Sequence, residues 1–256
     1  MNDKKIVMLA GEGNSTNIIY HAINSKFSVH TVILEKKESK KIFLRRRVRK
    51  LGLLNVLGQI LFQITIVRIL RGSAVKRIKS VIAENQLNVS AISESRVIRV
   101  NSINDNAVVE LLQKIEPDVI IVNGTRIISK KILNSTSALF INSHTGITPK
   151  YRGVHGGYWA LAKGDKSNCG VTVHLVDAGV DTGSVLYQDI IDVTNKDNFI
   201  TYPYLQTAKI RLILVKAIED ALLNKINRVE VKGQSKIWYH PTIWQYLYYR
   251  VFRNVK

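Results

Sequence analysis

Two short apolar runs near the start of the chain, separated by a glycine-rich turn and a helical segment, constrain the fold most strongly. The first run, KKIVMLAG, stops at Gly11, and the second, FSVHTVILEK, ends near Glu35. Between them, NSTNIIYHAINSK places its apolar residues on one side of a helix, with Asn14 or Ser15 as the expected N-cap. A strand, a helix and a strand in this order predict an α/β fold with an open, mostly parallel, Rossmann-like sheet.

Further apolar runs extend this pattern along the chain. EPDVIIVNG and ALFINSH are typical of buried strands, whereas NDNAVVELLQKI and residues 204–225 have helical spacing. CGVTVHLVD and GSVLYQDIIDV predict a pair of strands joined through AGVDT. The 256 residues suit one large domain, which we place at residues 1–225, followed by an aromatic and basic tail over residues 226–256.

Charge and cysteine content narrow the function classes. The chain has 38 Lys and Arg residues against 19 Asp and Glu residues, a net charge of +19, which favours anionic partners such as phosphorylated substrates, nucleic acid or acidic lipid. Cys169 is the single cysteine, so a disulfide framework within the chain is excluded. No long apolar stretch follows the N-terminal lysines, so we expect a cytoplasmic protein without a secretory signal.

A basic, helical segment at about residues 36–80 is expected to be an insertion into the sheet. Residues 36–79 hold 14 basic residues and one acidic residue. Polar residues recur every three or four positions from Lys41 to Gln63, which predicts a narrow polar stripe on one long helix. This helix could be buried against the domain, or residues 40–72 could lie on an anionic membrane surface. A membrane span is disfavoured, since the apolar stretch is short and contains Asn and Gln.

The residues best suited to chemistry lie at the end of ALFINSH. Asn142 and His144 are two positions apart on this strand, so their side chains share a face at the carboxyl end, where ligands bind in open α/β sheets. An amide N–H and an imidazole together suit a carbonyl whose oxygen becomes negative as an amine attacks it. The later segment VDAGVDTG offers Asp177 or Asp181 to orient the imidazole.

NSHTGITPKYRG, followed by GVTVHLVDAGVDTG, resembles the signature of the 10-formyltetrahydrofolate-dependent formyltransferases. The resemblance covers residues 117–190 well and the first strand and helix loosely. It implies direct transfer of a formyl group to a primary amine through a tetrahedral intermediate, without a metal. Asn142, His144 and Asp181 would be catalytic, with Asp181 holding His144 protonated. His174 is expected to be a core or supporting histidine.

The same resemblance implies contacts with the folate donor and the acceptor. The folate would contact two loops, made of Thr125, Arg126, Ile127 and Ile128 and of Val176, Asp177, Ala178, Gly179 and Val180. The acceptor would contact a first-turn phosphate site and a strand-end loop, made of Gly11, Gly13, Asn14 and Ser15 and of Tyr151, Arg152 and His155.

We expect the acceptor to be a nucleotide-linked amino sugar of polysaccharide biosynthesis. Only about 30 residues follow residue 225, too few for the β-barrel with which methionyl-tRNA formyltransferases are expected to bind tRNA, so nucleic acid is disfavoured. A lipid-linked amine and glycinamide ribonucleotide stay open as acceptors.

Two other classes of protein also stay open. One is a membrane-binding module with an inactive core. The other is an NAD-dependent oxidoreductase that uses Gly11, Gly13 and Glu35, which form half of a dinucleotide fingerprint.

Overall fold

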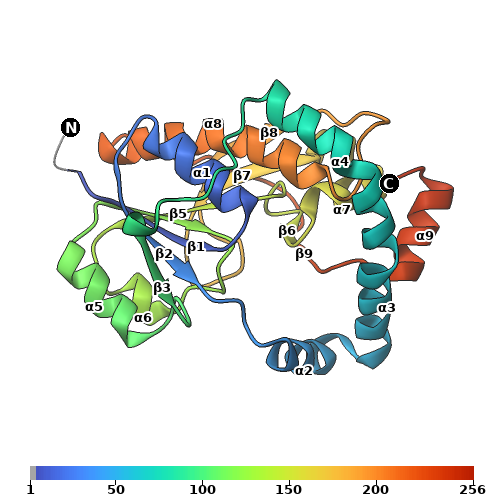
Figure 1. The fold of residues 1–256 in the computed structure, drawn as a ribbon, viewed down its shortest axis with the longest axis horizontal. Coiled ribbons are helices and arrows are strands. Elements are labelled where there is room, and N and C mark those ends of the chain that lie inside the picture. Colours follow the sequence, from blue (N-terminus) through green and yellow to red (C-terminus); the bar gives the residue numbers. More distant parts are fainter. Residues whose placement is uncertain (1–3) are drawn as a thin grey trace.

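The sheet that the sequence predicts is present in the computed structural model, which describes residues 4–256 (Figure 1). Its seven strands lie in the order β3-β2-β1-β4-β5-β7-β8. Their bounds are β1 (Ile6–Gly11), β2 (Val29–Glu35), β3 (Val97–Val100), β4 (Val119–Asn123), β5 (Leu139–His144), β7 (Gly170–Leu175) and β8 (Val185–Ile190). The first five strands pair in parallel, and β7 and β8 are antiparallel, which confirms the predicted fold class.

Helices cover both faces of this sheet (Figure 1). On one face lie α1 (Asn14–Asn24) and α8 (Tyr202–Leu222), and on the other lie α5 (Asn106–Ile115) and α6 (Lys130–Leu133). The prediction of Asn14 or Ser15 as the N-cap of α1 is wrong. The cap is Gly13, whose carbonyl accepts the backbone N–H of Asn17 at 3.2 Å.

The insertion forms three helices, so the prediction of one long helix is wrong. They are α2 (Lys40–Leu51), α3 (Leu53–Ile64) and α4 (Ile66–Glu84). The first break falls at Gly52, whose φ of 82° is a left-handed conformation that glycine adopts without steric cost. The polar stripe keeps its period across Gly52, so the pattern alone could not show the turn of the chain.

The insertion packs against the C-terminal tail, and α3 lies beside α9 (Ile243–Phe252) (Figure 1). A Cβ atom on Gly58 would fall 2.2 Å from the ring of Trp244, so the two helices pack in close contact there. Phe62 is fully buried, with its ring centroid 5.2 Å from that of Tyr246. No residue of α2 is buried, so α3 anchors the insertion while α2 stays at the surface.

A second, two-stranded sheet joins the tail to the loop after β5. Its strands are β6 (Arg152–Gly153) and β9 (Ile237–Trp238), which pair in parallel. The chain between them contains α7 (Gly156–Ala162), and Trp159 on this helix donates a hydrogen bond to the carbonyl of Tyr239 at 2.8 Å. Two 3-10 turns, Glu94–Arg96 and Lys166–Asn168, complete the regular structure of the described residues.

Candidate active site

The carboxyl end of β5 and the loop after β7 bring the three predicted catalytic side chains together. Asn142 and His144 lie on one face of β5, and Asn142 is paired with His174 on β7. The Nδ1 atom of His144 lies 3.4 Å from Oδ2 of Asp181, and Nδ2 of Asn142 donates to Oδ1 of the same carboxylate at 3.4 Å. One carboxylate thus contacts both an imidazole and a carboxamide.

His144 is held from its other ring nitrogen by the backbone. Its Nε2 donates to the carbonyl of Tyr151 at 2.7 Å, and the side chain is only 5% exposed. A Cβ atom on Gly146 would fall 2.7 Å from that Nε2 and 2.2 Å from the Tyr151 carbonyl. The glycine therefore provides the space in which the loop can turn back onto the imidazole.

Asp181 is positioned by backbone geometry as well as by its partners. Its φ of 51° is left-handed, which is unfavourable for a residue with a side chain and is found preferentially at functional sites. The Gly153 N–H donates to its Oδ2 at 2.9 Å. Burial by itself would raise the pKa of Asp181, but its interactions with His144, His174 and the Gly153 N–H outweigh burial and lower the pKa to about 2. Asp181 is therefore an anion at neutral pH.

Two opposing effects act on the protonation of His144. Burial lowers its pKa, and this effect exceeds the opposite effects of Asp181 and the Tyr151 carbonyl. Both ring nitrogens face acceptors, the Tyr151 carbonyl at Nε2 and the Asp181 carboxylate at Nδ1, so the cationic His144 stays a prediction. In the neutral form that burial favours, the ring carries its proton on Nε2. Nδ1 is then free to take a proton beside the Asp181 carboxylate.

His174 fixes the orientation of Asn142, which confirms its expected supporting role. Its Nδ1 donates to the carbonyl of Leu175 at 2.6 Å. In the neutral ring, Nε2 is then an acceptor, and it takes an N–H from Nδ2 of Asn142 at 3.0 Å. The amide nitrogen of Asn142 consequently faces His174 and Asp181.

The three residues of the strand-end loop that are predicted to contact the formyl acceptor differ in their exposure and contacts. The Tyr151 ring is 1% exposed and its hydroxyl donates to Asp165 at 2.8 Å, so the expectation that its side chain contacts the acceptor is wrong. Tyr151 acts instead through its carbonyl on His144. Arg152 is half-buried, and among the described residues no hydrogen-bond acceptor faces its buried Nε. This leaves the guanidinium able to bind an anion.

His155 links the loop to the insertion and the tail. Its φ is 58°, and its Nε2 lies 2.9 Å from Nδ1 of His240. The same His240 nitrogen is 3.2 Å from Nε2 of Gln63, and Gln59 donates to the His240 carbonyl at 2.8 Å. Burial lowers the pKa of His155 well below its ordinary value, with smaller contributions from His240 and Arg47. Burial, and secondarily Arg47, lowers the pKa of His240 to about 4.

These buried histidines should make the fold sensitive to mild acid. Because the pKa of His240 rises from about 4 to about 6.5 on unfolding, the unfolded chain binds more protons below pH 6.5 and stability falls with pH. We expect His240 alone to contribute a loss of about 2 kcal/mol between pH 8 and pH 5. Urea unfolding across this range should show a weaker pH dependence for His240→Gln. The exposed His30 provides the control, His30→Gln, which should retain the wild-type dependence.

The turn between β1 and α1 is built on close backbone contact. A Cβ atom on Gly11 would fall 2.5 Å from the carbonyl oxygen of Gly124, so only glycine allows β1 and β4 to approach at this point. Thr16 donates to the Gly11 carbonyl at 2.6 Å and accepts from Asn123 at 3.0 Å. Of the predicted phosphate-site residues, Gly13 and Ser15 lie exposed at the start of α1, and so does Asn14, whose Nδ2 donates to the Tyr204 hydroxyl at 3.0 Å.

Glu35 does not serve a dinucleotide. Its two carboxylate oxygens accept the backbone N–H groups of Ile103 at 2.8 Å and Arg126 at 2.9 Å, and its side chain is buried. Because the side chain is only 5% exposed, its carboxylate is not accessible to a ribose hydroxyl. This arrangement disfavours the oxidoreductase alternative, which required a free Glu35 beside Gly11.

The first predicted folate loop, residues 125–128, is only partly accessible. The Thr125 hydroxyl donates to the Arg126 carbonyl at 2.8 Å, and the Arg126 guanidinium donates to the carbonyls of Lys36 and Asn101. Ile128 is buried, whereas Ile127 is 59% exposed. Ile127 is thus the side chain of this loop that offers an apolar surface.

The second predicted folate loop follows β7 beside Asp181. Asp177 folds it, because its Oδ1 accepts the Gly179 N–H at 2.9 Å and the Thr182 hydroxyl at 2.6 Å. Ala178 and Gly179 are exposed, and Val176 and Val180 are half-buried. The exposed backbone here is compatible with a flat heterocycle lying beside Asp181 and the other predicted catalytic residues.

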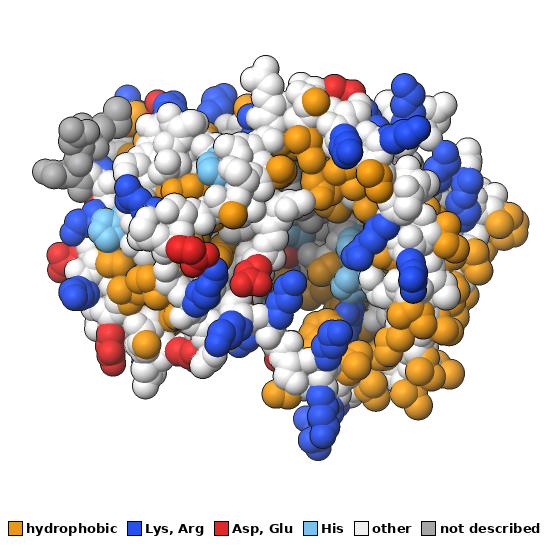
Figure 2. All heavy atoms as spheres, viewed as in Figure 1, with side chains coloured by type: hydrophobic (Ala, Val, Ile, Leu, Met, Phe, Trp, Pro, Cys, Tyr) orange, Lys and Arg blue, Asp and Glu red, His pale blue; other side chains and the backbone are white. Residues whose placement is uncertain are grey.

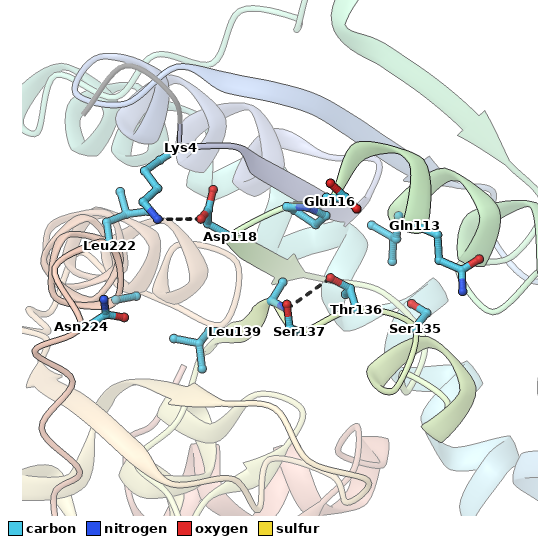
Figure 3. Close-up of a pocket in the computed structure, with 14 residues that line it drawn as sticks. Lys4, Gln113, Glu116, Asp118, Ser135, Thr136, Ser137, Leu139, Leu222 and Asn224 are labelled. Carbon is cyan, nitrogen blue, oxygen red and sulfur yellow. Dashed lines mark hydrogen bonds and ion pairs between the residues drawn. The ribbon is translucent and has the colours of Figure 1, made fainter.

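A separate surface depression lies away from these residues. It has a volume of about 620 Å³ and is found at the amino ends of β1, β4 and β5, where Lys4 donates to Asp118 at 2.8 Å (Figure 3). The predicted catalytic residues lie at the opposite edge of the sheet, at the carboxyl end of β5. Figure 2 shows a hollow in the surface with histidine side chains in it. Residues 4–256 contain no group of three or more His, Cys, Asp and Glu side chains placed to hold a metal ion.

Comparison with known proteins identifies the family. The model of the formyl transferase family matches residues 64–208, which is more than half of the chain. The chain belongs to the formyl transferase family. Among curated proteins, this formyl transferase is 41% identical over 101 residues to a methionyl-tRNA formyltransferase from Finegoldia magna, covering 39% of this chain and 32% of that protein. The matched part thus spans about a third of the length of that relative.

Solved structures share the fold at low sequence identity. A sugar N-formyltransferase from Shewanella sp. has a TM-score of 0.56 at 12% identity, covering 91% of this chain and 75% of that one. Glycinamide ribonucleotide transformylase 1 from Symbiobacterium toebii also has a TM-score of 0.56, at 18% identity, covering 89% and 91%. These likenesses confirm the α/β architecture of a formyl transferase.

Proposed function

We propose that this formyl transferase moves a formyl group from 10-formyltetrahydrofolate to the primary amine of a phosphorylated small molecule, with a nucleotide-linked amino sugar as the preferred acceptor. The observation that supports it most directly is the cluster of Asn142, His144 and Asp181 around one carboxylate. Folate would lie against Ile127 and the exposed backbone at Ala178 and Gly179.

The cluster suits acyl transfer between two nitrogens. The acceptor amine forms a new C–N bond to the formyl carbon, and the bond from that carbon to the donor nitrogen breaks. Asn142 donates to the oxygen that becomes negative the N–H that lies 3.4 Å from Asp181 in the structure, and keeps its shorter bond to His174. Nδ1 of His144 takes the proton that the amine loses, Asp181 stabilises the resulting imidazolium, and the same proton then passes to the departing nitrogen.

Charge favours a phosphorylated acceptor. The chain carries a net charge of +19, and the exposed turn at the start of α1 presents backbone N–H groups that suit a phosphate. The Arg152 guanidinium, with its buried Nε facing no acceptor among the described residues, adds a cation next to the catalytic loop. A lipid-linked amine is a second candidate, because α3 carries exposed apolar side chains and is linked through Gln63 and His240 to His155 in the strand-end loop.

A direct test incubates the protein and 10-formyltetrahydrofolate with amino-sugar nucleotides, glycinamide ribonucleotide and lipid-linked amines. The proposal expects one acceptor class to gain the mass of one formyl group, with equimolar release of tetrahydrofolate. A gain with glycinamide ribonucleotide alone would replace the preferred acceptor. If no amine is formylated while folate analogues fail to bind, the proposed activity is wrong.

Replacement of Asp181 by asparagine should separate catalysis from folding. The carboxamide would keep the shape of the side chain but could not stabilise the imidazolium of His144, so we expect kcat to fall at least a hundredfold, about 3 kcal/mol. Formyl transfer and the thermal midpoint should be measured together. Asp189→Asn on β8, whose carboxylate lies 3.3 Å from Lys209, is the matched control and should retain activity.

A further inference from the structure

An exposed apolar surface runs along α3 and α9, which pack side by side (Figure 1). Leu54 is 75% exposed and Phe252 is 69% exposed. The other exposed apolar side chains of these two helices are Leu53, Leu57, Leu61, Ile64, Trp244, Leu247, Tyr248 and Val251. A contiguous apolar area of this kind typically marks an interaction site, because leaving it in water costs free energy. We call these residues the apolar face.

A strongly basic helix borders the apolar face. Seven of the 12 residues of α2 are Lys or Arg and none is acidic, and α2 has no buried residue. Arg46 pairs with Glu38 at 2.9 Å, and no other α2 side chain forms an ion pair with any residue of 4–256. Ile42 and Phe43 on the same helix are also exposed. Figure 2 shows the apolar side chains gathered along one side of the molecule, with Lys and Arg side chains beside them.

We propose that the apolar face and α2 together dock on the surface of an anionic phospholipid bilayer. Apolar side chains of α3 and α9 would enter the boundary between headgroups and acyl chains, where Trp and Tyr are favoured. The unpaired basic side chains of α2 would contact lipid phosphates. The combination of a wide apolar surface with adjacent, uncompensated positive charge selects this partner over a neutral apolar one.

The helices would lie on the bilayer and not cross it. By length and composition alone, Leu53–Glu84 is apolar enough to span a membrane. In the structure, however, this stretch is divided into α3 and α4 at Thr65, and the 12 residues of α3 extend only about 18 Å against a hydrocarbon core of about 30 Å. The opposite side of α3, with Val56, Gln59 and Phe62, is buried in the protein.

A second copy of the chain is a poorer occupant of this surface. A symmetric dimer through the apolar face would bring two α2 helices near each other, each with seven basic residues and no acidic one. The net charge of +19 adds to that repulsion. An anionic surface is attracted by the same charges that oppose self-association.

Docking would place the catalytic loop close to the bilayer. Gln63 on α3 contacts His240, and His240 contacts His155 in the loop that leads from β6 to α7. Lys50 at the end of α2 lies 5.4 Å from the ring of Tyr239. The docking surface and the loop that carries the Gly153–Asp181 bond are therefore parts of one packed unit. This brings an amine held at the membrane surface within the reach of the site.

Vesicle flotation of the 256-residue chain tests the docking. We expect the protein to float with vesicles of phosphatidylcholine and phosphatidylglycerol, and not with phosphatidylcholine alone, and to be released at high salt. Arg45→Glu with Arg49→Glu should weaken binding at least tenfold, and so should Leu54→Glu with Leu57→Glu. The matched control is Lys114→Glu with Lys130→Glu, two exposed lysines on α5 and α6, which should bind at least half as well as the wild type.

Two measurements keep the outcome decisive. Circular dichroism and light scattering on every variant show whether the fold and the oligomeric state are unchanged. Wild-type protein that stays with the soluble fraction, or surface variants that float like the control pair, would overturn the proposal. A wild-type dimer that the Leu54 and Leu57 changes convert to a monomer, without vesicle binding, would assign the surface to self-association. Because flotation does not depend on turnover, it is independent of the proposed activity.

Discussion

Replacement of His144 by alanine is expected to lower kcat for formyl transfer by about a thousandfold, within the usual range for loss of a general base. The variant loses the acceptor for the amine proton, and Asp181 loses the imidazole 3.4 Å from its Oδ2. Steady-state formylation with the acceptor found in the screen measures the change. His30→Ala, at an exposed position on β2, should leave kcat within twofold of the wild type.

The pH profile identifies which form of His144 works. Because burial lowers its pKa below 6.5, the neutral imidazole should persist into mild acid, and kcat should fall only as the pH drops through that lowered pKa. A profile in which acid increases kcat would favour a cationic His144 and contradict the assignment. Residual activity of His144→Ala above a tenth of the wild type would rule out its role as the proton acceptor.

Gly146→Ala should be nearly as damaging, although the side chain it adds is one methyl group. The new Cβ atom would lie 2.2 Å from the Tyr151 carbonyl and 2.7 Å from Nε2 of His144, and both distances are far below van der Waals contact. The loop must move, and the 2.7 Å hydrogen bond that holds the imidazole is lost. We expect kcat to fall at least a hundredfold and the thermal midpoint to fall by several degrees.

Gly72→Ala is the matched control for this change. Gly72 lies within α4, and a Cβ atom there would meet no other atom within 4 Å. Alanine is the better helix former, so this variant should be at least as stable as the wild type and fully active. If both alanine variants behave alike, the space at Gly146 does not position His144.

Much of the candidate site could be predicted from the sequence, because its residues lie at or just after the carboxyl ends of strands. Alternation along β5 put Asn142 and His144 on one face, and the resemblance supplied Asp181, which lies 39 residues from Asn142 in the sequence and contacts it at 3.4 Å. The protonation of His144 could not be predicted, because it depends on how deeply the folded chain buries the ring. The sequence shows that Asp181 can stabilise a charged His144 ring, but it does not show how far burial removes water from that ring.

Other features of the structure could not be predicted, because they depend on contacts between segments that are far apart in the sequence. Tyr151 is predicted to contact the acceptor, but its ring is buried and its hydroxyl bonds to Asp165. His240 gave no signal in the sequence, since its role arises from contact with His155, 85 residues away. The helix break at Gly52 was hidden by a polar period that continues through it.

The parallel pairing of β6 with β9 affects when, during synthesis of the chain, the candidate site can become ordered. Gly153, whose N–H holds Asp181, is paired with Trp238, so the loop is braced by a segment made 85 positions later. On the ribosome, the central sheet has all its strands well before that brace emerges. A nascent chain would therefore contain the predicted catalytic side chains while still lacking the segment that braces their loop, and the proposed activity would begin only after residues 237–238 have emerged.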